Sequence, residues 1–166
     1  MNATTPAQNS APTSAPNSFE DIILYAIEQE EVEYGFYQHL ASLTTTADLK
    51  QMLLHHAQQE KEHVAKLQEV LSRHRLPNAT RVQANPDLHI ANYVVASPSD
   101  LTTLSYQDAL ILAIKMEQAN ENLYRDLANM SANDDNRTLF NFLVEQERKH
   151  RDLLEREYDD NILQQN

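Results

Sequence analysis

The sequence predicts an all-α protein, a four-helix bundle made of two helical hairpins that are joined by a long crossover. Three observations support this fold class. The 166 residues contain one Gly and many Leu, Ala, Glu and Gln, a composition that favours long helices. The chain repeats itself at an offset of 87 residues. Each copy of the repeat carries a Glu-x-x-His motif within a stretch whose apolar residues recur at helical spacing.

The repeat spans a complete hairpin in each half. Ser18 and Ser105 open the two copies, and each has an acid three residues later, which is typical of a capped helix start. Because the match continues to the Glu-x-x-His motifs, we expect hairpins at 18–75 and 105–160, a crossover at 76–104 and one four-helix domain over 18–160. Residues 1–17, rich in Asn, Ala, Thr, Pro and Ser, read as a disordered tail.

The first helix is predicted from Phe19 to about Leu43. Its inward face is expected to comprise Ile22, Ile23, Ala26, Ile27, Phe36, Leu40 and Leu43. Glu30 falls inside this apolar stripe, and its repeat mate Glu117 stands on a more apolar segment, which favours a ligand over the alternative of a solvated surface acid. Gly35 is the only glycine and lies mid-helix at a cost of about 1 kcal/mol relative to Ala, which close helix approach would explain.

The second helix is predicted after the Thr44–Thr46 run and continues to about His74. Its inward face is expected to comprise Met52, Leu53, Ala57, Val64, Leu67 and Leu71. Glu60 and His63 share that face. A buried carboxylate and imidazole without partners would cost several kcal/mol, so the pattern indicates a metal. His56, one turn earlier, is interpreted as a core histidine with its own partner, the alternatives being a bond to a ligand carboxylate or an extra nitrogen ligand for the metal.

The second hairpin is predicted to contain helices from Tyr106 to about Met130 and from about Asp134 to Tyr158. A crossover of full bundle length lets both hairpins present matching faces, and its apolar residues would pack along the bundle or on a partner subunit. The basic residues of this half are expected mainly on outer faces: Lys115, Arg125, Arg137, Arg148, Lys149 and Arg151.

The two Glu-x-x-His motifs indicate a pair of metal ions. Residues three apart lie on one face of a helix, so a carboxylate and an imidazole reach one ion. In di-iron and di-manganese carboxylate bundles, two helices supply one Glu each and the other two supply Glu-x-x-His. Here that set is Glu30, Glu60, His63, Glu117, Glu147 and His150. With turns near Thr44 and Ser131, all four helices place their ligands about 22 Å from a bend, at one height.

Composition excludes several other classes of protein. A net charge of −12 argues against binding to nucleic acid or to anionic membrane surfaces. Because there is no Cys, a redox metal must be held by carboxylate and imidazole. The N-terminus has neither a basic start nor an apolar run, and no stretch reaches the length of a membrane span. We expect a soluble cytoplasmic protein.

The constellation resembles rubrerythrin, the non-haem di-iron peroxidase branch of the ferritin-like superfamily. The resemblance covers about 140 residues of helix and rests on Glu30 followed by Phe36-Tyr37, Glu117 followed by Leu123-Tyr124, and the two Glu-x-x-His pairs. It implies two iron ions, although carboxylate and imidazole also suit manganese. Tyr37 and Tyr124, two turns after their ligand Glu, are expected to hydrogen-bond site carboxylates and serve as catalytic-site residues.

Two departures from the family pattern bear on the chemistry. Rubrerythrins commonly append a rubredoxin domain, and this chain has no Cys, so the resemblance implies an external electron donor such as a rubredoxin-like protein. Rubrerythrins also have a further Glu three residues after the third-helix ligand, where this chain has Asn120. The repeat mate of Asn120 is Glu33, which becomes a candidate seventh ligand.

The resemblance implies a peroxide reductase that acts on hydrogen peroxide. The residues also fit a ferroxidase, an iron-handling protein or a bundle that reduces O2, and a non-catalytic metal-stabilised bundle is a further alternative. A homodimer is expected, with exchanged hairpins as one form of it, because one hairpin alone leaves its metal face uncovered.

Overall fold

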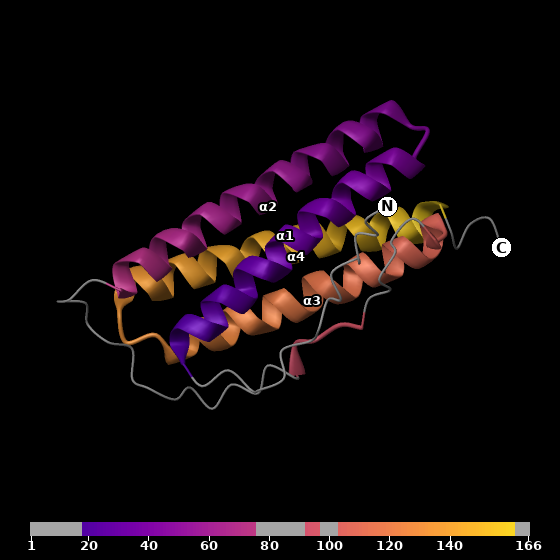
Figure 1. Cartoon of the computed structure of the whole chain (residues 1–166). Helices are drawn as coiled ribbons and strands as arrows, with labels where there is room; N and C mark the ends of the chain where they lie inside the picture. Colours follow the sequence, from indigo (N-terminus) through magenta and orange to yellow (C-terminus); the bar gives the residue numbers. More distant parts are fainter. Residues whose placement is uncertain (1–17, 76–91, 97–102, 162–166) are drawn as a thin grey trace, which may run out of the picture.

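The computed structural model describes residues 18–75, 92–96 and 103–161 and forms a bundle of four long helices (Figure 1). The helices are α1 (Phe19–Leu43), α2 (Ala47–His74), α3 (Tyr106–Met130) and α4 (Asp134–Asn161). Helices α1 and α2 form one hairpin and α3 and α4 the other, and the two hairpins lie side by side (Figure 1). Within the described ranges there is no strand. The predicted fold class is confirmed, and α4 ends at Asn161 rather than Tyr158.

At the start of three helices, the oxygen of a short polar side chain accepts a hydrogen bond from a backbone N–H group. The Oγ of Ser18 accepts the N–H of Asp21 at 3.1 Å, and the Oγ of Ser105 accepts the N–H of Asp108 at the same distance. These are the predicted cap positions, and each satisfies a backbone N–H that has no partner within the helix. Asn133 does the same for α4 by accepting the N–H of Asp135 at 2.8 Å.

The apolar core is divided into two clusters. One joins the start of α1 to the ends of α2 and α3 and the start of α4, and it includes Ile22, Ile23, Leu67, Leu127 and Phe140. The other lies towards the opposite end of the bundle and includes Phe36, Leu40, Leu53, Leu110 and Leu154. Ten polar or charged residues are buried among the described residues, and most of them lie between these clusters at mid-length of the helices. The middle of the bundle is therefore polar and shielded at both ends.

The described parts of the crossover pack along the bundle. Tyr93 is buried in the first cluster, and its hydroxyl donates a hydrogen bond to Asp126 of α3. Val95 and Leu104 pack against the second cluster. The described parts of the crossover therefore contact both core clusters, whereas Leu88 and Ile90 lie outside the described residues.

Three side chains differ from the inward and outward faces predicted above. Leu43 and Met52 are 39% and 37% exposed, because Leu43 is the last residue of α1 and Met52 instead lines a surface hollow with Leu153 of α4. Arg151 is only 16% exposed because it reaches the buried Glu121. A Cβ added to Gly35 would meet nothing within 4 Å, so the close-approach interpretation of this glycine is wrong.

The described residues contain four long helices. None of them is both long enough and apolar enough to cross a bilayer.

Candidate metal centre

All six predicted ligands lie in the polar middle of the bundle, and every helix contributes to it. Helix α1 supplies Glu30, α3 supplies Glu117, and α2 and α4 supply the two Glu-x-x-His pairs. Their exposed fractions range from 0 to 2%. They meet because residues about equally far from each turn come to one height in antiparallel helices. Three overlapping groups of these side chains, with Glu33 added, place their ligand atoms within 4.8 Å of one another.

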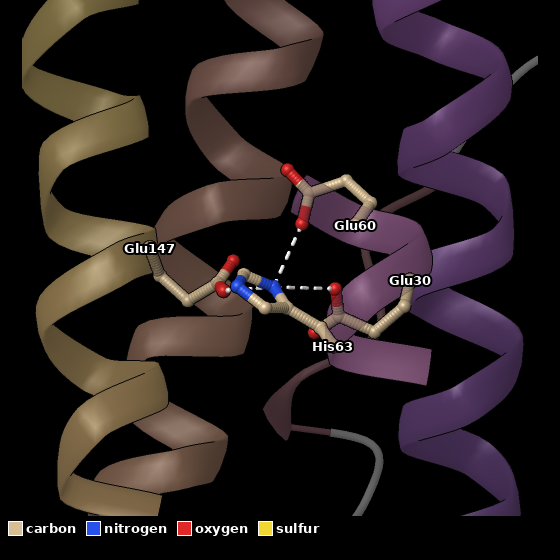
Figure 2. Close-up of side chains that lie close together, drawn as sticks. All are labelled: Glu30, Glu60, His63 and Glu147. Atoms are coloured by element: carbon tan, nitrogen blue, oxygen red, sulfur yellow. Dashed lines mark hydrogen bonds and ion pairs between the residues drawn. The ribbon is translucent and has the colours of Figure 1, made fainter. Parts of the chain in front are cut away.

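The first group surrounds the imidazole of His63 with carboxylates from three helices (Figure 2). Its Nδ1 lies 2.8 Å from Glu60 Oε2, 3.1 Å from Glu30 Oε2 and 3.2 Å from Glu147 Oε1. One N–H cannot serve three carboxylates at once. A cation that accepts several oxygen and nitrogen ligands matches this arrangement better than a proton does.

The second group is built on His150. Its Nδ1 lies 2.8 Å from Glu60 Oε1 and 3.7 Å from Glu117 Oε1. The rings of His63 and His150 stack with centroids 5.9 Å apart. Glu60 belongs to both histidine groups and offers one oxygen to each, so its carboxylate lies where it would bridge two ions.

The third group contains carboxylates only, from Glu33, Glu117 and Glu147. Glu33 is 2% exposed, so the structure brings this candidate seventh ligand into the centre. The Nδ2 of Asn120 donates a hydrogen bond of 3.0 Å to Glu33 Oε2 and leaves Oε1 without a partner. Glu33 is thus the fifth carboxylate of the centre as a whole. Because Glu117 also belongs to the His150 group, Glu33 lies on the His150 side.

Two buried tyrosines hydrogen-bond carboxylates across the bundle. The hydroxyl of Tyr37 on α1 donates to Glu117 Oε1 on α3 at 2.5 Å, and that of Tyr124 on α3 donates to Glu30 Oε1 on α1. Both tyrosines are fully buried. Each pair links the two hairpins, so the phenols hold Glu117 and Glu30 in place and leave the second oxygen of each carboxylate without a phenol partner.

Several buried ligand atoms have no hydrogen-bond partner in the described structure. They are both oxygens of Glu60 and Glu147, Oε2 of Glu117, Oε1 of Glu33 and Nδ1 of His150. An unpaired buried polar atom costs about 1 to 3 kcal/mol, and more when it is charged. All seven atoms are of types that can coordinate a metal ion, and all belong to residues of the three groups above. The donor set therefore fits metal binding, and oxygen with imidazole suits iron or manganese.

The pKa values show how the protein without metal balances this charge. Burial raises the pKa of Glu30 to about 7, and burial with Glu147 nearby raises that of Glu33 well above its usual range. Burial lowers the pKa of His63, but Glu30, Glu147 and Glu60 outweigh it and raise that pKa. Burial lowers the pKa of His150 to about 4. Protons therefore replace part of the charge of a bound metal.

Sequence reasoning missed one side chain that contacts this centre, Gln59, and one buried acid a helical turn away from it, Glu121. Gln59 places Oε1 3.2 Å from Nε2 of His150. Glu121, one turn after Glu117, is 3% exposed and pairs with Arg125, Arg148 and Arg151. A signal existed for Gln59, since it precedes Glu60 directly and is repeated as Gln146. Glu121 gave none, because its repeat mate is Tyr34.

His56 has its own partner, as interpreted from the sequence. Its Nδ1 pairs with Gln59 Oε1 at 2.9 Å rather than with a ligand carboxylate. Its ring lies against His150, with centroids 4.3 Å apart, and against Tyr37 at 5.6 Å. Burial lowers the pKa of His56 to about 4, so its imidazole is neutral at neutral pH.

A four-helix bundle with a candidate carboxylate and histidine metal site is the class that the fold and the centre define, and solved structures share the fold. One is a candidate ferritin-like diiron-carboxylate protein from Thermotoga maritima, with 23% identity, a TM-score of 0.71 and coverage of 87% of this chain and 95% of that chain. Another is a hypothetical protein from Pyrococcus furiosus, with 26% identity, a TM-score of 0.65 and coverage of 86% and 89%.

Sequence comparison then gives the family. The rubrerythrin family model matches residues 21–158, so the chain belongs to the rubrerythrin family. The matched range includes α2 and α3, all but the outer ends of α1 and α4, and every candidate ligand. A comparison with curated protein sequences gives no match.

Proposed function

We propose that this protein is a non-haem di-iron oxidoreductase that reduces hydrogen peroxide and takes electrons from an external donor. One observation carries the proposal. Two imidazoles and five carboxylates converge in a buried layer, and many of their ligand atoms have no partner there. Family membership supports the choice of iron and of a redox reaction.

The residues divide into two terminal sets and a shared pair. Glu30 and His63 would hold one ion, and Glu117 and His150 the other, with Glu33 as an added ligand on the second side. Glu60 and Glu147 lie in groups with both sides and would bridge the ions. Four of the carboxylates offset the charge of two divalent ions, which a low-dielectric interior requires.

Two ferrous ions, when bound, supply the two electrons that convert hydrogen peroxide and two protons into two water molecules. The protein holds the site dry, because apolar clusters cover it towards both ends of the bundle. Tyr37 and Tyr124 keep their protons at neutral pH, since burial and the carboxylates raise their pKa values well above 10. Both phenols therefore remain donors to Glu117 and Glu30.

The electrons have to come from outside these 166 residues. The sequence contains no Cys that would ligate an iron–sulfur or rubredoxin-type centre. A small redox protein of the rubredoxin type is therefore the donor that we propose.

Rapid mixing of the diferrous protein with hydrogen peroxide or with O2 tests the proposal. We expect faster oxidation by peroxide, followed as diferric absorbance, and retention of two irons through gel filtration. Glu60→Gln should abolish this oxidation, because both oxygens of Glu60 face the centre. Glu62→Gln, an exposed position on the same helix, should behave as the wild type.

Each alternative outcome overturns the proposal in its own way. Faster oxidation by O2, with iron that leaves the protein afterwards, would establish an iron-handling ferroxidase. Retained iron without redox cycling would establish a metal-stabilised bundle. Failure to bind transition metal at all would remove the metal centre itself.

A further inference from the structure

We propose that Gln59 is a positioning residue that fixes His150 in the tautomer whose Nδ1 is free to bind metal. Gln59 directly precedes Glu60 on α2, and its side chain is half-buried. Its Oε1 lies 3.2 Å from Nε2 of His150 and 2.9 Å from Nδ1 of His56. The inference rests on the metal centre of the proposed function but is independent of the reaction catalysed there.

The chemistry of the amide oxygen decides where the imidazole hydrogen lies. A carbonyl oxygen only accepts hydrogen bonds, so Nε2 of His150 must carry the hydrogen in this contact. A neutral imidazole has one N–H, which leaves a lone pair on Nδ1. This Nδ1 is buried, has no hydrogen-bond partner and lies 2.8 Å from Glu60 Oε1, another acceptor. A cation between these two atoms would satisfy both.

His56 holds Gln59 in place from the other side. It donates its own Nδ1–H to the same amide oxygen, and its ring packs edge-on against that of His150 at an angle of 70°. The amide oxygen therefore receives two N–H groups and has little freedom to turn away. Partners of this kind orient ligand imidazoles, and their loss typically weakens metal binding about 10- to 100-fold.

The other half of the chain lacks this arrangement. The repeat mate of His56 is Leu143, a fully buried apolar side chain that donates no hydrogen bond. The repeat mate of Gln59 is Gln146, for which the described structure shows no side-chain hydrogen bond to His63 or to another residue. His150 therefore has a glutamine partner that His63 lacks. Gln59 should affect the binding of one metal ion only.

The test is a Co²⁺ titration of the metal-free full chain, read from visible absorbance and binding stoichiometry. The wild type should take up two Co²⁺. Gln59→Leu should weaken one of the two sites about 10- to 100-fold and leave the other unchanged. Gln59→Glu should restore the weakened site, since a carboxylate accepts the same hydrogen bond. Gln146→Leu is the matched control and should bind as the wild type.

A second readout needs no metal. NMR of the histidine ring nitrogens in the metal-free protein should show the Nε2–H tautomer of His150 in the wild type and Gln59→Glu. A mixture of tautomers should appear in Gln59→Leu. Wild-type cobalt binding by Gln59→Leu, or an unchanged tautomer, would overturn the inference. If instead the wild type bound no cobalt, the metal centre would fail, while the tautomer readout would still report on Gln59.

Discussion

The amide of Asn120 donates a 3.0 Å hydrogen bond to the carboxylate of Glu33, its counterpart at the same position of the other half of the chain. Two equivalent residues of a two-fold repeat can touch only if both lie close to the axis that relates the two halves. The approximate axis therefore passes through the metal centre. Because one member is an acid and the other an amide, the centre has an extra carboxylate on one side only.

Glu33→Gln should weaken metal binding and stabilise the metal-free protein. The Gln side chain can keep the hydrogen bond from Asn120, but it removes a buried carboxylate that Glu147 and Glu30 repel. We expect about tenfold weaker binding of one metal, together with a higher melting temperature in chelator. Calorimetry with and without metal measures both effects. Glu31→Gln, exposed on the same helix, is the control, and unchanged metal affinity in Glu33→Gln would exclude Glu33 as a ligand.

Tyr37→Phe should destabilise the protein without changing its fold. The substitution removes the 2.5 Å hydrogen bond to Glu117 and leaves that buried oxygen unpaired. Leaving a buried acceptor unpaired costs about 1 to 3 kcal/mol, which sets the expected loss in urea unfolding. Tyr124→Phe should cost a similar amount, because its hydroxyl serves Glu30 in the equivalent place. A change below about 0.5 kcal/mol in either variant would show that the contact contributes little.

Removal of metal should lower the melting temperature. A ligand present at 100 times its Kd adds about 2.7 kcal/mol of stability. For a chain of this size, 1 kcal/mol shifts the melting temperature by about 2 to 4 °C. We therefore expect chelation to lower it by about 5 to 10 °C in a thermal scan. An unchanged melting temperature would contradict the assignment of all six predicted ligands.

The metal-free protein should lose stability as pH rises above about 6.5, the usual pKa of histidine. The surrounding carboxylates raise the pKa of His63 against the effect of burial, so the folded state keeps a proton there that the unfolded state releases. Glu33 and Glu117, whose pKa values burial raises, act in the same direction. The stability that these groups contribute is fully present below their pKa in the unfolded state. It is lost as the pH rises towards their pKa in the folded state.

His56 and His150 have the opposite effect on stability, but only below about pH 6.5, the usual pKa of histidine. Burial lowers their pKa values to about 4, so they favour folding as pH rises only up to about 6.5. Melting temperatures at pH 6.5 and pH 8 in chelator, compared with those of metal-loaded protein, measure the net effect. Greater stability at pH 8 without metal would contradict the prediction.

Gly35→Ala should stabilise the protein by about 0.5 to 1 kcal/mol. Glycine in a helix interior is costly relative to alanine, and a Cβ at this position would meet nothing within 4 Å. Urea unfolding of the metal-free variant measures the gain. A loss of stability would mean that the backbone near Glu33 needs the freedom of glycine.

The sequence alone was sufficient to predict the four helices and to select six candidate ligands that the structure brings together. Apolar periodicity and two serine caps placed the starts of α1 and α3, because these signals are local. The offset between Glu60 and Glu147 then fixed the height at which the helices meet, since rise per residue is constant in a helix. Exposure at Leu43 and Met52 was not predictable, because it depends on how far a neighbouring helix extends.

The sequence determined which side chains can meet. Because the hairpin is duplicated and the rise per residue is the same in every helix, equivalent residues lie at the same height along the bundle. Tertiary structure alone decided which of them touch across the halves. It joined Tyr37 to Glu117, Asn120 to Glu33 and Gln59 to His150. The physical reason is that these contacts depend on the rotation of each helix about its axis, which packing of the whole core sets and no spacing along the chain records.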